Sequence, residues 1–404
     1  MFQSFRNLGS ALVCALLATA VCGAPAASQS LHDFVEAAAS RTPDLASVAA
    51  RRDAIAARQT AADGLTPGAP VFNGSYLTDQ LIRNRQQREL QIGLSTPIWL
   101  PGEGSAARAL ANAEADRAAT QVATTRLKLA GQVRDLLADF ALAQAELALA
   151  ERRLRDARAT EGDVDRRARV RDASEADLLL ARAERIAADA ELQDRQVALK
   201  QNRLAFQTLT GLPPVATALR EPLAAAADAN DPRLGEARGA ITVARANQTL
   251  TGIQLRDSPE IGVIARRSRD ALGSFYNHSI GVEMRIPFAT DARNRPRQTA
   301  AQAELTEAAA GYDTIARELD AARQKARIGY DNALIQHDLA RARSQALARQ
   351  SALVGRSYQA GQVSLEAVLR ARAFAYEAEA TSIRADIASA SAVGKLNQAY
   401  GVMP

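Results

Sequence analysis

The feature that most constrains this chain is a short alternating segment that ends near a proline and runs into a very long helical pattern. It occurs twice, at residues 92–97 and 280–287, almost half a chain length apart. After the first copy, residues 103–169 contain no proline. A helix of that length would be about 100 Å long, which no ordinary globular domain requires. The sequence therefore predicts long rods joined to a strand region.

The first of these helical patterns carries a regular apolar stripe. Its members recur at alternating spacings of four and three: Leu129, Val133, Leu136, Phe140, Ala143, Leu147, Ala150 and Leu154. Such spacing is typical of a coiled-coil seam. Only 4% of the residues are aromatic, which disfavours a thick globular core and favours long helices packed closely side by side.

The two halves of the chain share one order of elements. Each is predicted to contain a helix, a strand hairpin, a long helix, a short break and a second helix; the first of these helices is expected to run unbroken over residues 31–63. Equivalent landmarks such as Ser174 and Ser364, or Gly211 and Gly401, keep a nearly constant offset, which predicts an internal duplication. The predicted divisions are a signal peptide at 1–26, a first repeat at 27–211 with its hairpin at 71–98, a linker at 212–230, and a second repeat at 231–404 with its hairpin at 260–286.

Residues 1–26 have the pattern of a secretory signal peptide. Arg6 precedes an apolar stretch at 8–21, and small residues at Ala24 and Ala26 suit cleavage after Ala26. A retained anchor helix is an alternative that the short apolar stretch disfavours, and lipoprotein processing at Cys22 is another. Cys14 and Cys22 both lie in this segment, so the mature chain is expected to contain no disulfide.

The predicted strands are amphipathic and long enough to cross a bilayer when tilted. In the second copy, Ile280, Val282 and Met284 alternate with polar residues or glycine. A sheet of four strands would leave two edges whose backbone groups have no hydrogen-bond partner in lipid. A closed barrel therefore requires several chains, and three chains would supply twelve strands. The predicted lumen residues are Ser95, Ser279, Glu283 and Arg285. The alternative is a small soluble sheet that caps a helical bundle.

Several function classes are disfavoured. The net charge is +5, and Lys and Arg are interleaved with Asp and Glu, which indicates solvated helix faces and not a nucleic-acid surface. Three scattered histidines and no mature cysteine give no metal cluster of recognised spacing. Gly102 and Gly104 partly match the glycine pattern of dinucleotide-binding proteins, but the helix that follows is too long for a βαβ unit. We expect no enzyme activity, no cofactor and no bound metal.

Two segments, together with the duplicated plan, resemble the TolC-like outer-membrane efflux proteins across essentially the whole mature chain. They are Gly-Leu-Ser-Thr-Pro-Ile at 93–98 and the stretch 358–372, which contains Tyr358, Gly361, Ser364 and Ala371. Residues 99–102 are similar to the cation-efflux, CzcC-like branch. The resemblance implies a mainly α-helical chain with a β-barrel portion: a homotrimer whose 12-stranded outer-membrane barrel, four strands per chain, continues into a long periplasmic helical barrel.

The resemblance also implies a function and partners. The chain would be the passive exit duct of a tripartite efflux system for metal cations or small toxic compounds. Its partners would be a periplasmic membrane-fusion adaptor, an inner-membrane efflux pump of the RND type, and outer-membrane lipid. Two alternatives stay open: an exit channel for type I protein secretion, and a periplasmic coiled-coil scaffold without a pore.

A gate at the periplasmic tip is a further implication of the resemblance. Asp177 and Tyr358 stand where family members pair an aspartate with a tyrosine. The tip set is Arg171, Asp172, Ser174, Asp177, Tyr358, Gly361, Ser364 and Glu366. For Ser174 and Ser364, helix capping is the favoured interpretation. Ala367 and Arg370 occupy the positions of an acidic ring that some members carry, so that ring is not reproduced, although Asp172, Glu175 and Glu366 are nearby acids.

Arginines cluster near the two predicted hairpin loops. They are Arg83, Arg85, Arg88, Arg266, Arg267 and Arg269. We hypothesise that they pair with lipopolysaccharide phosphates. The alternative is an ordinary solvated loop.

Overall fold

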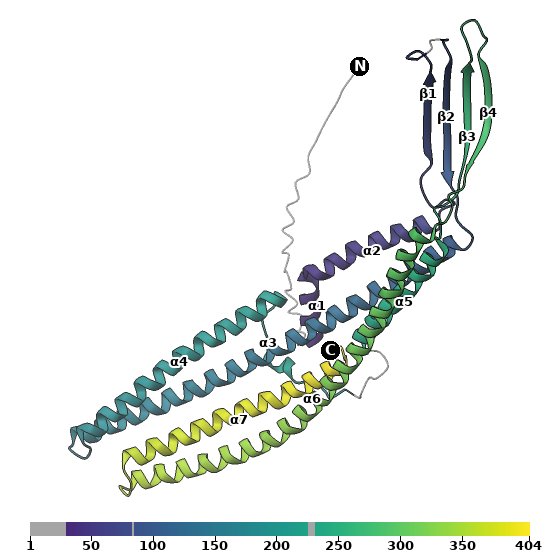
Figure 1. Cartoon of the computed structure of the whole chain (residues 1–404). Helices are drawn as coiled ribbons and strands as arrows, with labels where there is room; N and C mark the ends of the chain where they lie inside the picture. The colour runs from purple at the N-terminus through teal and green to yellow at the C-terminus, as the bar shows by residue number, and fades with distance from the viewer. Residues whose placement is uncertain (1–29, 83–84, 225–230) are drawn as a thin grey trace, which may run out of the picture.

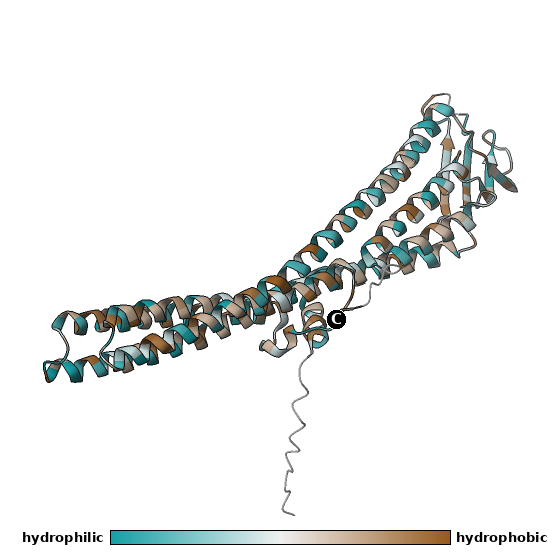
Figure 2. Cartoon of the chain, turned by 90° about the horizontal axis from the view of Figure 1, so that it is seen from below, coloured by the Kyte–Doolittle hydropathy of each residue, from teal (hydrophilic) through white to brown (hydrophobic). Residues whose placement is uncertain are grey.

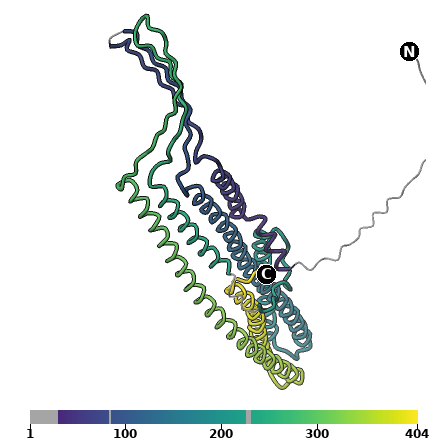
Figure 3. The backbone as a smooth tube through the Cα atoms, turned by 90° about the vertical axis from the view of Figure 1, so that its right-hand side faces the viewer, coloured from purple at the N-terminus to yellow at the C-terminus, as the bar shows by residue number. Residues whose placement is uncertain are grey.

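The computed structural model describes residues 30–82, 85–224 and 231–404. The predicted signal peptide and Arg83 lie outside these ranges. The described chain is elongated. A sheet lies at one end, and the two turns that connect the long helices lie at the other (Figures 1 and 3).

Two long helical hairpins form most of the molecule. Helix α3 (Glu103–Arg169) returns as α4 (Glu175–Thr210), and α6 (Asp291–Gln359) returns as α7 (Leu365–Ala399). Helix α3 packs against both α4 and α7, so the layer has the order α4, α3, α7, α6, with both turns at the same end (Figure 1). The proline-free rod predicted over 103–169 is confirmed.

Shorter helices connect the hairpins to the sheet. Helices α1 (Leu31–Arg41), α2 (Pro43–Ala62) and α5 (Pro232–Ile253) pack along α3, and a 3-10 turn (η1) covers Ala216–Leu219. The prediction of one unbroken helix over 31–63 is wrong. Thr42 has an extended backbone before Pro43, because the proline ring disfavours the helical conformation of the preceding residue.

The main apolar core lies where α1, α3, α4 and η1 meet. Phe34 of α1 and Phe206 of α4 are fully buried, and their rings meet edge to face with centroids 5.0 Å apart. Val133 and Leu137 of α3 and Leu219 of η1 complete the contact. Most of the predicted apolar stripe of α3 is buried, with Leu136 and Leu147 only half-buried.

The four strands form one antiparallel sheet. They are β1 (Val71–Thr78), β2 (Arg88–Pro97), β3 (Glu260–Arg269) and β4 (Asn277–Arg285), in the order β1-β2-β3-β4. The two halves of the chain therefore join through the pairing of β2 with β3. In this described sheet, the outer edges of β1 and β4 have no partner strand. Among the described residues, no helix is both long enough and apolar enough to cross a membrane.

Candidate functional site

The sheet has one continuous apolar face that nothing in the described chain covers. Residues directly opposite each other in antiparallel strands share a face: Leu94 lies opposite Val263, which lies opposite Val282. The large residues of this apolar face are 41–82% exposed. They are Phe72, Tyr76, Leu90, Ile92, Leu94, Ile261, Val263, Ile280, Val282 and Met284. An apolar patch of this kind marks a surface that meets lipid or another protein.

The opposite face of the sheet is polar and ion-paired. It brings together all four residues predicted to line a lumen: Ser95, Ser279, Glu283 and Arg285. The Glu260 carboxylate lies 3.6 Å from the Arg285 guanidinium and accepts a 3.5 Å hydrogen bond from the Ser95 hydroxyl. The sheet therefore separates a water-compatible face from an apolar face, and in Figure 2 its strands carry both hydrophilic and hydrophobic residues.

The helical end of the molecule contains two turns of the same design. Arg171 in the first turn and Gly361 in the second both have a left-handed backbone, with φ of 64° and 73°. Ser174 caps α4: its hydroxyl accepts from the Asp177 amide at 3.0 Å and donates to the Asp177 carboxylate at 2.7 Å. The Ser364 hydroxyl caps α7 by accepting from the Ala367 amide at 3.3 Å. The predicted capping by both serines is confirmed.

An apolar cluster holds the two turns together. All four long helices contribute to it, through residues that include Val164 (α3), Ala181 (α4), Tyr358 (α6) and Leu365 (α7). The Arg167 guanidinium lies 5.0 Å from the centre of the Tyr358 ring, and burial raises the pKa of the Tyr358 phenol.

The other predicted tip residues lie around this cluster. Asp177 directs its carboxylate to the Ser174 cap, and Asp172 and Arg171 are exposed in the first turn. Glu366 pairs with Arg370 one helical turn later. The arginine at the position of the absent acidic ring therefore already has a local acidic partner.

A polar seam that sequence analysis missed joins the two hairpins. Four pairs run antiparallel along α3 and α7: Glu146 with Arg384 (2.8 Å), Arg152 with Glu379 (2.5 Å), Asp156 with Tyr376, and Thr160 with Arg372 (2.5 Å). We call these four pairs the α3–α7 seam. Burial and the adjacent Asp156 carboxylate raise the pKa of Tyr376, so its hydroxyl stays protonated and donates. The four-residue spacing of 156 with 160 and of 372 with 376 places each pair on one helix face, but it does not specify which helix that face meets.

Inside the first hairpin, α3 and α4 meet through an apolar contact of Leu154, Ala157, Ala188 and Leu192. Ion pairs accompany it, among them Arg153 with Glu184 at 2.8 Å and Arg195 with Glu146 at 2.6 Å. The Glu146 carboxylate therefore joins α3 to both neighbours, because its other oxygen accepts from Arg384 of α7 in the seam.

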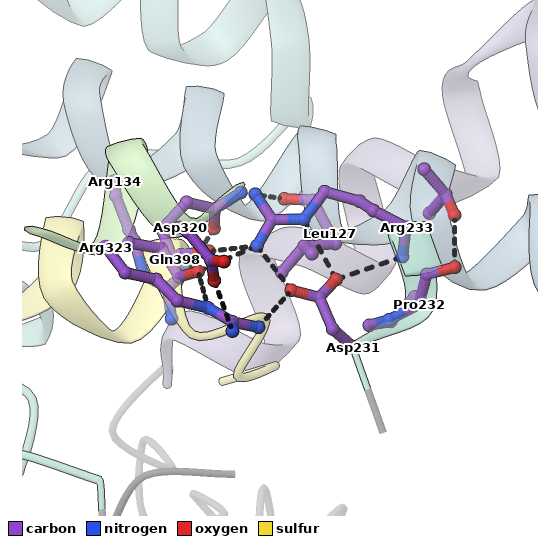
Figure 4. Close-up of polar contacts among 10 residues, drawn as sticks. Leu127, Arg134, Asp231, Pro232, Arg233, Asp320, Arg323 and Gln398 are labelled. Carbon is purple, nitrogen blue, oxygen red and sulfur yellow. Dashed lines mark hydrogen bonds and ion pairs between the residues drawn. The ribbon is translucent and has the colours of Figure 1, made fainter. Parts of the chain in front are cut away.

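A buried ionic cluster fixes the middle of the molecule (Figure 4). The Asp231 side chain has no exposed surface and lies 2.8 Å from Arg233 and 3.2 Å from Arg323. Burial favours a raised pKa for this carboxyl, but the hydrogen bonds and charge of Arg233, with Arg323, hold the Asp231 pKa below its ordinary value. Nearby, Arg134 pairs with Glu221 at 2.8 Å. Sequence analysis placed residue 231 only at the start of the second repeat.

Metal-binding side chains do not gather anywhere in the described ranges: no group of three or more His, Cys, Asp or Glu residues is placed to hold an ion.

Comparison with known proteins finds no match by sequence and clear matches by structure. No protein-family model and no curated protein matches the chain. The outer-membrane protein VceC from Vibrio cholerae superposes with a TM-score of 0.73 at 17% identity, over 92% of this chain and 96% of VceC. The outer-membrane channel CmeC from Campylobacter jejuni gives 0.73 at 15% identity, over 92% of this chain and 85% of CmeC.

A third structure is the open state of the MtrE outer-membrane channel from Neisseria gonorrhoeae. It superposes with a TM-score of 0.71 at 18% identity, over 92% of this chain and 89% of MtrE. The match includes both helical hairpins and the sheet, because it covers nearly the whole described chain. The chain therefore has the fold of the TolC-like outer-membrane channels.

Proposed function

We propose that three copies of this chain form an outer-membrane channel, the passive exit duct of a tripartite efflux system. One observation carries the proposal: the sheet exposes a continuous apolar face and backs it with an ion-paired polar face. In lipid, a four-stranded sheet with two free edges is unstable, because the hydrocarbon offers its backbone no hydrogen-bond partner. Three sheets closed edge to edge give twelve strands, an even number within the range of such barrels.

In this arrangement the apolar face meets outer-membrane lipid and the polar face lines the channel. Ser95, Ser279, Glu283 and Arg285 would contact water and solutes. The helical hairpins extend into the periplasm and meet a membrane-fusion adaptor and an RND-type pump. Two further parts belong to the same proposal. Residues 231–404 duplicate residues 27–211 across the linker 212–230, which the repeated hairpin plan supports. Residues 1–26 are removed as a signal peptide.

The tip is proposed to open by movement of one hairpin relative to the other. The residues around the turns, from Arg171 to Asp177 and from Tyr358 to Glu366, would form the gate, and the α3–α7 seam would hold it in one of two states. Adaptor binding then shifts the population between the states. Metal cations or small toxic compounds are the proposed cargo.

The experiment that tests the channel is reconstitution of the full-length chain, purified from outer membranes, into planar lipid bilayers. We expect a trimer in detergent and discrete conductance steps. A monomer that stays in solution without detergent and produces no steps would contradict the proposal, and would favour a scaffold without a pore.

Loosening the α3–α7 seam is expected to raise the open population. The double variant Arg372→Gln and Tyr376→Phe removes two contacts per chain, each worth about 1.5–3 kcal/mol because a charged group takes part. Single-channel recording should show at least a severalfold increase in mean conductance. Arg349→Gln on the exposed surface of α6 makes the same charge change away from the seam and should behave as wild type. Unchanged conductance in an intact double-variant trimer would show that the seam does not control the gate.

A further inference from the structure

The sheet register separates the arginines near the hairpin loops into two groups. Arg88, Arg267 and Arg269 lie on the apolar face: Arg88 is directly opposite Arg269, and Arg267 is opposite Leu90. Arg266, the neighbour of Arg267, lies on the polar face, where its guanidinium is 2.7 Å from the Glu89 carboxylate. Only the first group, which we call the arginine trio, therefore shares a surface with the exposed apolar residues.

The arginine trio lies where the apolar face ends. On β2 the apolar face runs from Thr96 through Leu94, Ile92 and Leu90 before it reaches Arg88. The step from Thr96 to Leu90 covers roughly 20 Å of strand, close to the apolar height of an outer-membrane barrel, about 25 Å. If the apolar face lies in the hydrocarbon, the three guanidinium groups lie at the level of the lipid headgroups.

The trio has no acidic partner in the described chain. None of its members forms a salt bridge with a described carboxylate, although Arg266 next to them does. Two like charges directly opposite each other across a strand pair destabilise the sheet. The Nε atoms of Arg88 and Arg269 are also buried without a hydrogen-bond partner. Arg269 donates to the Gln86 backbone carbonyl at 3.4 Å and to its side-chain oxygen at 3.5 Å, but neither group carries a charge. The trio therefore concentrates positive charge that no described carboxylate balances, which suits an anion.

An aromatic ring orients two of the three side chains. The Arg267 and Arg269 guanidinium carbons lie 4.0 Å and 5.1 Å from the centre of the Tyr276 ring. Stacking on a ring restricts the guanidinium group while leaving its N–H edges free to donate. Arg267 and Arg269 are thus held in place for bidentate contacts to an oxyanion, with Arg88 directly opposite Arg269.

We infer that Arg88, Arg267 and Arg269 form a binding site for the phosphate groups of a lipid in the outer leaflet. The inference rests on the proposed channel function, because the site requires the apolar face to be embedded. Guanidinium groups pair with phosphate through two parallel hydrogen bonds. The acyl chains of the same lipid would contact the apolar face beside Leu90 and Ile280. A lipid with more than one phosphate matches three adjacent cations better than a free ion does.

The test measures binding of fluorescent lipid A to the purified trimer in detergent micelles. Diphosphorylated and dephosphorylated lipid A are compared, with excess inorganic phosphate as competitor. We expect wild type to bind the diphosphorylated form at least about tenfold more tightly, and the double variant Arg267→Gln and Arg269→Gln to lose that preference. For a one-residue comparison, Arg267→Gln should weaken binding, and Arg266→Gln, its neighbour on the opposite face, should stay within about twofold of wild type.

Three results would overturn the inference. They are equal binding of the two lipid forms by wild type, equal effects of Arg266→Gln and Arg267→Gln, and full competition by inorganic phosphate, which would indicate a small-anion site. A flotation assay with neutral phosphatidylcholine vesicles separates this failure from failure of the channel proposal. Wild type that floats without phosphate preference contradicts only the lipid site, whereas wild type that does not float contradicts the channel. Retention of the trimer by each variant confirms that it has folded.

Discussion

Replacing Asp231 with alanine is expected to lower the free energy of unfolding by about 3–5 kcal/mol, the typical effect of removing one partner from a buried ion pair. The carboxylate is fully buried between Arg233 and Arg323, which are 25% and 15% exposed. Without it, Arg233 loses its acidic partner, and Arg323 keeps only the exposed Asp320 carboxylate. The contacts also join α5 and α6 to the C-terminal end of α7, since Arg233 donates to the carbonyl of Ala399 at 2.9 Å. Thermal unfolding followed by circular dichroism should show a clearly lower midpoint.

Asp320→Ala is the matched control for this prediction. Asp320 also contacts Arg323, at 3.6 Å, but its side chain is 70% exposed. Exposed ion pairs contribute about 0–1 kcal/mol, so the midpoint should hardly change. If the two alanine variants had equal midpoints, the buried pair would not stabilise the centre of the molecule.

The same carboxylate gives stability an acid dependence. The folded-state pKa of Asp231 is below its ordinary value of 3.8, so the folded chain binds the proton less readily than the unfolded chain. The stabilisation is therefore fully present above the unfolded-state pKa and is lost as pH falls through it toward the lower folded-state pKa. Asp231→Asn should show a smaller loss of thermal stability below about pH 4 than wild type. Identical acid curves for the two proteins would contradict this assignment.

Features of the fold that depend on neighbouring residues could be predicted from sequence. Each successful prediction used a pattern between residues close together in the chain. The patterns are the absence of proline over 103–169, the alternation at 280–286, and the spacing of Ser174 and Asp177. The break at Thr42 was missed although its cause, Pro43, is also local. The prediction rested on the absence of any proline after Pro43, and it did not treat Pro43 itself as a helix boundary.

The missed residues are those whose role depends on distant partners. Asp156 and Tyr376 are 220 positions apart, and Asp231 and Arg323 are 92 apart. No local pattern specifies which helix faces meet. From sequence alone, a charged residue that pairs with another helix therefore looks the same as one that faces water. The arginines show the same limit. Arg266 and Arg267 are adjacent and chemically identical, and the alternation along β3 places them on opposite faces. The sequence analysis grouped them without assigning faces, and the pairing with β2 and β4 shows which neighbours each one has.

Replacing Val263 with arginine is expected to prevent stable accumulation in the outer membrane. Val263 lies near the middle of the apolar face, opposite Leu94 and Val282, and is 57% exposed. Arginine on the lipid face at the bilayer midplane costs about 2–4 kcal/mol in each chain, or roughly 6–12 kcal/mol in a trimer. Membrane fractionation should show loss of the heat-sensitive trimer from the outer-membrane fraction.

Ile264→Arg makes the same chemical change one residue further along β3, on the opposite face. Ile264 lies opposite Gly93 on one side and Gly281 on the other, so the polar face has space beside it for a longer side chain. In the proposed channel a cation there would contact the water of the lumen, so the amount of trimer in the membrane should stay close to wild type. Equal losses in the two variants would show that residues 263 and 264 meet the same environment, which is incompatible with lipid on one face of the sheet and water on the other.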